Sequence, residues 1–294
     1  MKGIILAGGT GARLSPVSRG ANKHLLPVYD KPMIYYPLAV LLQAGIRDLL
    51  VITNPSDVGA FEKLLGAGRR FGARIQFAEQ PNPGGIAEAL IIGRPFVGQE
   101  RVALALGDNI LFGPKLQPLL DRAVARTDGA TVFACPVRDP ERFGVVALNK
   151  RGMAMSLVEK PTVPASRLAV VGLYFYDHQA VDLALQLSPS ERGELEITDL
   201  NRLYLSREQL FVERLSRGTV WLDAGTCESL WRASCAVRSA QGRQRRLIGC
   251  PEEVALRAGF ISPDNVIRQA HPPRNDYDHY LLQMSAACSV QSGG

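Results

Sequence analysis

The chain has 294 residues, of which 46% are hydrophobic and 21% are charged, so it can bury a full core as one large domain with an appendage. The 34 Lys and Arg exceed the 28 Asp and Glu, but the basic residues are scattered, which fits a protein handling polyphosphates better than a nucleic-acid binder. No stretch approaches the roughly 20 apolar residues of a membrane span, and the five cysteines form no C-x-x-C pair. We therefore expect a cytoplasmic protein with reduced thiols that binds neither nucleic acid nor membrane.

Short apolar runs alternate with amphipathic segments in the first half of the chain. Near-continuous apolar strands separated by helices are typical of a mostly parallel sheet covered on both faces, so this rhythm predicts a doubly wound, Rossmann-like α/β fold. The predicted strands are residues 3–7, 48–53, 73–78, 102–106 and 130–135, and the predicted helices lie near 34–44, 57–66, 85–92 and 115–126.

The rhythm changes after about residue 140, where shorter strands indicate an inserted, partly antiparallel lobe. The chain reads as helical from about residue 228 onward. The pattern predicts strands at 144–148, 154–159 and 169–176, and helices near 178–187 and 196–206. We therefore expect an α/β domain over 1–227, with halves at 1–139 and 140–227, and a helical C-terminal appendage over 228–294 with a flexible tail.

The first predicted strand runs into the glycine-rich loop Gly8-Gly9-Thr10-Gly11, followed closely by Arg13. Glycines let backbone N–H groups approach an anion, and arginine adds a forked, permanently charged donor, so the segment predicts a phosphate cradle. By itself such a loop could also be a simple strand-to-helix turn. No lysine with a hydroxyl neighbour follows Gly11, as a P-loop requires, and Leu14 occupies the place of the third glycine of a dinucleotide loop.

Two aspartates follow apolar runs and form a candidate metal site. Asp108 follows the strand 102–106, and Asp223 ends the run 220–222. Ligands of a doubly wound sheet bind at the carboxyl ends of its strands, and magnesium usually takes one or two carboxylates plus substrate phosphates. A turn or helix N-cap aspartate is the alternative for Asp108, because Gly107-Asp108-Asn109 is also a common turn sequence.

Glu159 and Lys160 end the predicted strand 154–159. Side chains alternate across a strand, so at least one of the two must face a cleft or water. A solvent-exposed strand end is the alternative to a binding role.

Eight segments, in order and with the expected gaps, resemble the bacterial sugar-1-phosphate nucleotidylyltransferases, most of all the glucose-1-phosphate thymidylyltransferases. The similarity runs from residue 1 to about residue 258. The segments are LAGGTGARL (6–14), KHLLPVYDKPMIYYPL (23–38), GDN (107–109), PERFGVV (140–146), EKP (159–161), GLYFYD (172–177), RGELEITD (192–199) and WLDAGT (221–226).

The resemblance implies an enzyme that uses Mg²⁺ to join dTTP and glucose 1-phosphate, giving dTDP-glucose and pyrophosphate by in-line attack on the α-phosphorus. It also implies a homo-oligomer, a tetramer or a dimer. The same chemistry with UTP or another sugar 1-phosphate is an alternative, and so is a catalytically silent regulator that binds nucleotide sugars. A nicotinamide-dependent oxidoreductase is disfavoured, because Leu14 replaces the third glycine and Thr53-Asn54-Pro55 offers no acid for a ribose.

The same resemblance assigns roles to individual positions. Catalytic roles fall to Arg13, Lys23 and Lys160, and metal ligation to Asp108 and Asp223. The expected nucleotide contacts are Leu6, Gly8, Gly9, Thr10, Gly11, Arg13, Gln80, Pro83, Gly85 and Ile86. The expected sugar-phosphate contacts are Asn109, Gly144, Glu159, Lys160, Val171 and Gly172.

Several positions depart from the family pattern. His24 and Glu88 stand where relatives have glutamine, Val171 replaces a threonine, and Pro114 replaces a histidine of a secondary nucleotide site used for product feedback. Nucleotide preference, sugar preference and feedback regulation therefore stay open. We expect Trp221 to pack in the core or at a subunit contact rather than against a ligand.

Overall fold

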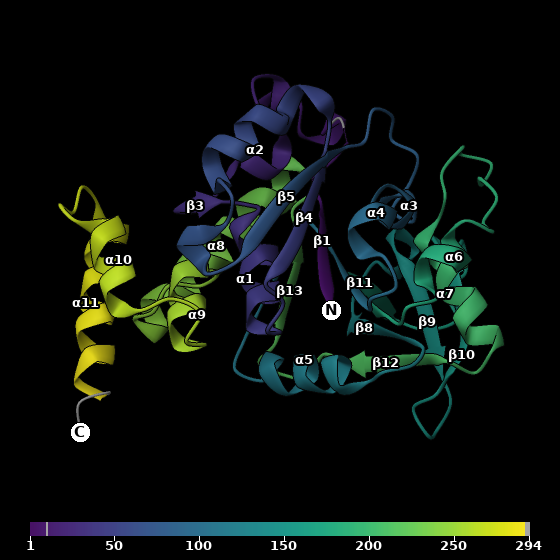
Figure 1. The fold of residues 1–294 in the computed structure, drawn as a ribbon. Coiled ribbons are helices and arrows are strands. Elements are labelled where there is room, and N and C mark those ends of the chain that lie inside the picture. The colour runs from purple at the N-terminus through teal and green to yellow at the C-terminus, as the bar shows by residue number, and fades with distance from the viewer. Residues whose placement is uncertain (10, 292–294) are drawn as a thin grey trace.

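The structure is a computed structural model that describes residues 1–9 and 11–291 (Figure 1). Thr10, an expected nucleotide contact, and residues 292–294 of the expected tail lie outside the described residues.

A nine-stranded mixed sheet forms the centre of the chain. Its parallel part has the order β6-β1-β4-β5, built from Val102–Leu106, Lys2–Leu6, Asp48–Thr53 and Arg74–Glu79. The antiparallel part begins with β11 (Leu168–Tyr176), which pairs with β6 and with β8 (Ala130–Pro136). The predicted strands and the mostly parallel α/β fold are thus confirmed, and β8 joins the antiparallel side.

Two apolar cores lie on opposite faces of this sheet, because successive side chains of a strand point in opposite directions. Ile5 belongs to the core that contains Leu38 of α1 (Tyr35–Gln43), whereas Ile4 belongs to the core that contains Leu90 of α3 (Glu88–Ile92). Helices α2 (Val58–Leu65) and α5 (Leu116–Ala125) contribute to the first core, and α6 (Ala180–Ala184) and α7 (Ile197–Ser206) to the second. The expected helices on both faces are therefore present.

The second half of the chain extends the sheet with antiparallel strands, as expected. Strands β9 (Gly144–Leu148) and β10 (Ala154–Glu159) form a hairpin beside β11, and β12 (Leu210–Arg214) pairs parallel to β8. A separate two-stranded ladder, which the pattern analysis did not predict, joins β7 (Asn109–Phe112) to β13 (Val220–Asp223).

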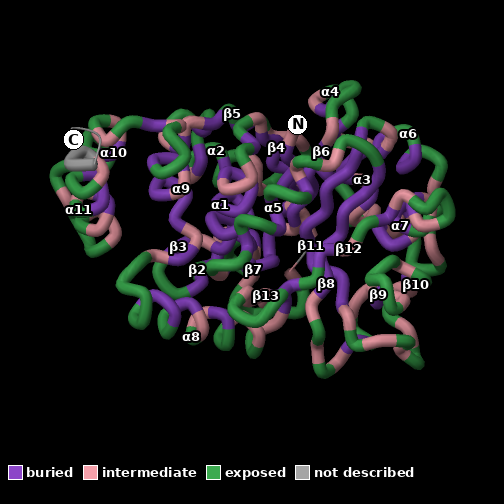
Figure 2. Tube along the Cα trace, turned by 90° about the horizontal axis from the view of Figure 1, so that it is seen from below, coloured by how far each residue is buried: buried purple, intermediate pink, exposed green. Residues whose placement is uncertain are grey.

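Four helices end the chain. Helix α8 (Cys227–Gln244) begins with a capping box between Thr226 and Ser229, and it packs on β13 and on the short strand β2 (Pro27–Val28). Helices α9 (Pro251–Arg257), α10 (Pro263–Ala270) and α11 (Asp276–Gln291) share an apolar cluster of their own at one end of the molecule (Figure 2). Within the described part of the chain, no helix has the length and apolar character needed to cross a bilayer.

Candidate active site

A cavity of about 720 Å³ opens at the carboxyl ends of the central strands and joins the two halves of the chain. The first half contributes predicted residues from the glycine loop, the turn after β5 and the segment around Lys23. The second half contributes residues from the β9–β10 hairpin and β11. The predicted residues that line the cavity are Leu6, Gly8, Gly9, Arg13, Lys23, Gln80, Pro83, Gly85, Ile86, Asp108, Asn109, Gly144, Glu159, Lys160, Gly172 and Asp223.

Two expected contacts do not line this cavity. Gly11 precedes the short 3-10 turn Ala12–Leu14 with a φ of 61° and packs against Ser18. Val171 is fully buried in the core that contains Leu38, whereas Val170 lines the cavity. Because side chains alternate along β11, a cavity that reaches Val170 and Gly172 excludes the side chain between them. The Val171 side chain therefore faces the core and not this cavity, and the expected sugar-phosphate contact at Val171 stays a prediction.

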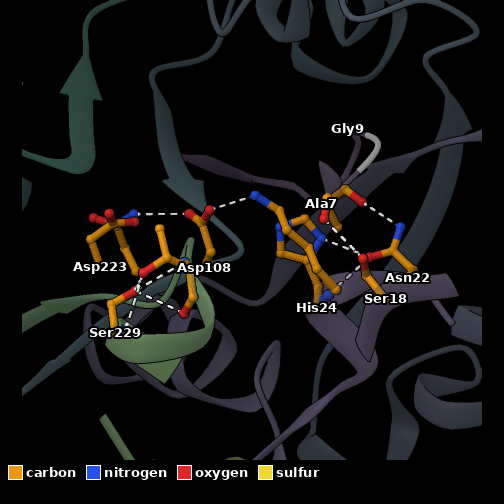
Figure 3. Close-up of polar contacts among 12 residues, drawn as sticks. Ala7, Gly9, Ser18, Asn22, His24, Asp108, Asp223 and Ser229 are labelled. Atoms are coloured by element: carbon orange, nitrogen blue, oxygen red, sulfur yellow. Dashed lines mark hydrogen bonds and ion pairs between the residues drawn. The ribbon is translucent and has the colours of Figure 1, made fainter. Parts of the chain in front are cut away.

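The glycine loop is held open by side chains from neighbouring elements (Figure 3). Gly9 has a φ of 94°, a left-handed conformation that disfavours other residues. Its N–H donates to Asn54 Oδ1 at 3.3 Å, and Asn54 Nδ2 donates back to the Gly9 carbonyl at 3.2 Å. Asn22 Nδ2 donates to the carbonyl of Ala7 at 3.1 Å. These contacts fix the backbone that the sequence predicts to surround a phosphate.

His24 lies buried beside this loop as a neutral imidazole. Burial, and then the Lys23 ammonium, lower the pKa of His24 to about 3. Its Nδ1 lies 2.8 Å from Asn22 Oδ1. An amide oxygen only accepts hydrogen bonds, so Nδ1 carries the proton and Nε2 is an acceptor. His24 therefore adds no positive charge to the cavity at neutral pH.

Lys23, Asp108 and Asp223 form what we call the inner charge cluster (Figure 3). Lys23 Nζ lies 2.5 Å from Asp108 Oδ2, and Asn109 Nδ2 donates to Asp108 Oδ1 at 3.0 Å. Burial opposes ionisation of Asp108, but the Lys23 charge and the hydrogen bonds from Lys23 and Asn109 together outweigh it and hold the Asp108 pKa well below its usual range. Burial, and then the charge of Asp108, raise the pKa of Asp223, and the nearby cations Arg13, Lys23 and Arg142 offset this only in part. The charge of Asp108 is thus better compensated by its neighbours than that of Asp223.

The β7–β13 ladder brings the two carboxylates together. Asp223 is the register partner of Asn109, and the Ala224 N–H donates to the Asp108 carbonyl at 3.0 Å. Gly225 follows, where a Cβ would lie 3.0 Å from Arg13 Nη2 and 3.2 Å from Asp223 Oδ1. The lack of a side chain at Gly225 thus leaves room for the guanidinium of Arg13 beside the carboxylate.

This pair of carboxylates fits a cation that is shared with a substrate. Among residues 1–9 and 11–291, no group of three or more His, Cys, Asp or Glu side chains could hold a metal alone. Magnesium, however, commonly takes one or two carboxylates and completes its shell with substrate phosphates and water. Burial and the repulsion from Asp108 raise the pKa of Asp223, and a divalent cation would relieve that repulsion.

Glu159, Lys160 and Arg192 form a second group, the outer charge cluster. Thr198 Oγ1 donates to Glu159 Oε2 at 2.5 Å, and Lys160 Nζ lies 3.6 Å from Glu159 Oε1. Arg192 Nη2 lies 4.0 Å from that same oxygen. Lys160 has a φ of 41° just beyond β10, and this left-handed backbone breaks the strand alternation. Both Glu159 and Lys160 can therefore face the cavity.

Trp221 packs against the core that contains Leu38, as expected, and it also lines the cavity. Its Nε1 donates to Asn109 Oδ1 at 2.7 Å, and its ring centroid lies 5.2 Å from that of Phe143. The strand pattern held a signal for this placement, since Trp221 and Asp223 are two residues apart and share a face of β13. Other lining residues without a predicted role are His24, Leu106, Arg142, Phe143, Val170, Tyr174, Arg192, Glu194, Ile197 and Thr198.

The loop after β5 is tied to the other half of the chain. The Leu195 N–H donates to the Gly84 carbonyl at 2.8 Å, and the Ala87 N–H donates to the Leu195 carbonyl at 3.1 Å. Gly85 has a φ of 101°, and a Cβ there would lie 2.6 Å from the Leu195 nitrogen. Glycine is thus required for this close approach between the two walls of the cavity.

Comparison with known proteins agrees with this geometry. Residues 2–240 match the nucleotidyl transferase family. The chain is 54% identical to a glucose-1-phosphate thymidylyltransferase of Neisseria meningitidis, over 97% of this chain and 99% of that one. It is 52% identical to a protein of the same name from Mycolicibacterium smegmatis, again over 97% and 99%.

Two solved structures are similar to this chain. A glucose-1-phosphate thymidylyltransferase of Bacillus anthracis, solved with sucrose, superposes with a TM-score of 0.76 at 44% identity, over 81% of this chain and 95% of that one. A UDP-glucose pyrophosphorylase shares the fold with a TM-score of 0.72 at 22% identity, over 81% of this chain and 98% of that one. The chain therefore belongs to the nucleotidyl transferase family and, within it, to the glucose-1-phosphate thymidylyltransferases.

Proposed function

We propose that the chain joins dTTP and glucose 1-phosphate to give dTDP-glucose and pyrophosphate. The observation that carries this proposal is a single cavity in which the glycine loop and inner charge cluster face the outer charge cluster. Such a cavity has room for two anionic substrates side by side. Relatives of the same name, at about half identity over nearly the whole chain, support the choice of substrates.

The nucleotide, in this proposal, occupies the half of the cavity that the first part of the chain builds. Its triphosphate lies against Gly8, Gly9 and Arg13, where the glycines leave room for phosphate oxygens and the guanidinium provides a charged donor. Its base lies in the pocket between Gln80 and Gly85, where the side-chain amide of glutamine can hydrogen-bond to a pyrimidine edge.

The sugar 1-phosphate occupies the other half. Asn109, Gly144, Glu159 and Gly172 provide amide, backbone and carboxylate groups for the sugar hydroxyls, and Lys160 provides a cation for the phosphate. The ammonium of Lys160 lies 3.6 Å from Glu159 Oε1, and its side chain is about half exposed, so it is accessible to a phosphate.

Asp108 and Asp223 would hold a magnesium ion between the substrates. When bound there, magnesium would neutralise charge on the triphosphate and strengthen the electrophilic character of its α-phosphorus. Lys23, already paired with Asp108, keeps that carboxylate ionised over the physiological pH range. Arg13 stands beside Asp223, where it can bind an oxygen of the departing pyrophosphate.

The proposed chemistry requires no general base. An oxygen of the sugar phosphate forms a bond to the α-phosphorus, the bond from the α-phosphorus to the bridging oxygen breaks, and pyrophosphate leaves with that electron pair. The phosphate monoester is already anionic, and the buried, neutral His24 is not needed to remove a proton. Because repulsion between anions forms the barrier, each preorganised cation contributes on the order of 2.7–4 kcal/mol to transition-state stabilisation.

A substrate panel tests the proposal. Purified protein with Mg²⁺ is given several sugar 1-phosphates, each with dTTP, UTP, CTP, ATP or GTP, and pyrophosphate release is measured. We expect dTTP with glucose 1-phosphate to rank first and UTP second. If no pair of substrates released pyrophosphate, the proposed activity would be rejected. A silent regulator that binds nucleotide sugars would then be favoured.

Cellular setting and assembly belong to the same proposal. We propose a cytoplasmic enzyme that works as a homo-oligomer, a tetramer or a dimer. The resemblance to the glucose-1-phosphate thymidylyltransferases supports this assignment. Light scattering of the purified protein would measure the oligomeric state.

A further inference from the structure

The side-chain amide of Gln80 is held in one orientation by Glu88. Gln80 is 4% exposed and lines the cavity, whereas Glu88, the first residue of α3, lies behind it and is half-buried. Gln80 Nε2 donates to Glu88 Oε2 at 2.6 Å and makes a longer contact of 3.4 Å with the Gly85 carbonyl. Both partners are oxygens that can only accept, so the amide cannot rotate by half a turn without losing them.

This orientation leaves the amide oxygen of Gln80 toward the glycine loop. A Cβ built on Gly8, which also lines the cavity, would lie 2.6 Å from Gln80 Oε1. None of the hydrogen bonds among residues 1–9 and 11–291 is donated to this oxygen. Gln80 therefore presents an acceptor, and not a donor, to whatever base enters the pocket.

The loop backbone at Gly84 packs directly against the Glu88 carboxylate. A Cβ built on Gly84 would lie 2.5 Å from Glu88 Cδ. The carbonyl of Gly84 accepts a hydrogen bond from the Leu195 N–H in the opposite wall, which helps to hold this loop in place. The loop thus limits movement of the carboxylate on one side, while Gln80 Nε2 donates to it on the other.

We propose that Glu88 is a positioning residue for base selection, which it achieves by locking the Gln80 amide with its oxygen toward the cavity. A locked acceptor favours a base with an N–H at the facing edge, as thymine and uracil have at N3. It disfavours cytosine, whose N3 is itself an acceptor, because two acceptors would then face each other in a buried site. This inference rests on the proposed function, since it assumes that Gln80 meets the base.

The test is the base preference of Glu88→Gln. A glutamine at position 88 can donate as well as accept, so Gln80 becomes free to turn its NH₂ toward the cavity. We expect the ratio of dTTP affinity to dCTP affinity, measured by isothermal titration, to fall at least about tenfold, mainly through tighter dCTP binding. Glu79→Gln is the matched control, because Glu79 is exposed and adjacent in sequence, and its ratio is expected to stay at the wild-type value.

A second measurement uses the wild-type protein alone and so does not depend on the variant folding. N3-methyl-dTTP lacks the N3–H, and wild type is expected to bind it at least about tenfold more weakly than dTTP. Equal wild-type affinities for dTTP and dCTP, or an unchanged ratio in folded Glu88→Gln, would overturn the inference while leaving the proposed function intact. Lack of dTTP binding by wild type would overturn both.

Discussion

The inner and outer charge clusters contain similar groups in different surroundings. In the inner cluster the side chains of Lys23, Asp108 and Asp223 are 15%, 12% and 19% exposed. In the outer cluster the side chains of Lys160 and Arg192 are 47% and 45% exposed. Coulombic interactions strengthen as water is excluded, so each inner charge acts strongly on its neighbours, whereas outer charges are screened.

This difference in exposure suggests that the inner and outer charge clusters have different roles. The inner cluster is organised before substrate arrives, with Lys23 paired to Asp108 and with Asp223, whose charge is only partly compensated, beside them. The outer cluster makes looser contacts and can adjust as a sugar phosphate binds. We therefore expect changes in the inner cluster to affect the chemical step and stability, and changes in the outer cluster to affect mainly the affinity for one substrate.

The largest expected effect follows from removing an inner carboxylate charge. Asp108→Asn and Asp223→Asn should each lower turnover at least about a hundredfold, because each keeps the size of the side chain but removes a charge that a magnesium ion needs. Pyrophosphate release over a range of magnesium concentrations measures the effect. Asp264→Asn, at an exposed position of α10, should keep wild-type activity.

Stability separates the two inner variants. The Asp108 pKa is lowered by folding, so its charge stabilises the fold above the unfolded pKa, and Asp108→Asn should lower the free energy of unfolding by about 1–3 kcal/mol. The Asp223 pKa is raised, so its ionised form weakens the fold at neutral pH, and Asp223→Asn should raise stability. Urea unfolding at neutral pH in EDTA measures both. Losses of the same size in the two variants would contradict the unequal roles assigned to these carboxylates.

Acid sensitivity provides the next largest effect. Folding lowers the pKa of His24 from its ordinary 6.5 to about 3, so the folded state resists protonation that the unfolded chain accepts. The contribution of His24 to stability is complete above pH 6.5 and is lost as the pH falls toward 3. Between about pH 7.5 and pH 5, protonation of His24 in the unfolded chain should lower the free energy of unfolding by roughly 2 kcal/mol. Urea unfolding at the two pH values should show a smaller loss of stability in His24→Gln than in wild type. Equal losses in the two proteins would mean that another group is responsible.

Lys160→Met probes the outer cluster with a smaller effect. Methionine keeps the apolar stem and removes the ammonium, so affinity for glucose 1-phosphate should fall about tenfold and the rate of attack should also fall. Affinity for dTTP should change much less, since Arg13 and Lys23 serve that half of the cavity. Separate titrations of the two substrates test this, with the exposed Lys150→Met as the control. Weakened dTTP binding with intact sugar-phosphate binding would reverse the assignment.

Salt should produce the smallest difference. Raising NaCl from about 0.05 to about 0.5 M shortens the screening length severalfold, which weakens exposed charges more than buried ones. The KM for glucose 1-phosphate should therefore rise by a few-fold, and the KM for dTTP by less. Steady-state kinetics with Mg²⁺ held constant measure both values. A larger rise for dTTP would mean that exposure does not distinguish the two clusters.

The sequence predicted the central sheet well because its strands are continuous apolar runs, of which Val102–Leu106 is an example. The β7–β13 ladder was missed, since its strands lie far apart in the chain and Asn109 begins a strand within a turn-like sequence. Pairing between distant short segments depends on tertiary structure, which local patterns do not carry.

Site residues could be predicted where they directly follow or end a predicted strand. Asp108 and Asp223 were found by that rule, and the cavity brings them together. The core-facing side chain of Val171 follows from strand alternation, because its neighbours Val170 and Gly172 face the cavity. Arg192 and Thr198 lie in RGELEITD, a segment that carried part of the resemblance, but no role was predicted for them. The folding of this segment against the loop at Gly84 decides where they lie.

One labelling experiment tests the proposed reaction most directly. Glucose 1-phosphate that carries oxygen-18 in its non-bridging phosphate oxygens is turned over with dTTP and Mg²⁺, and the products are weighed by mass spectrometry. Attack of the sugar phosphate on the α-phosphorus predicts that dTDP-glucose retains all of the label and that pyrophosphate contains none. Oxygen-18 in the released pyrophosphate, or dTDP-glucose without label, would contradict the proposed reaction.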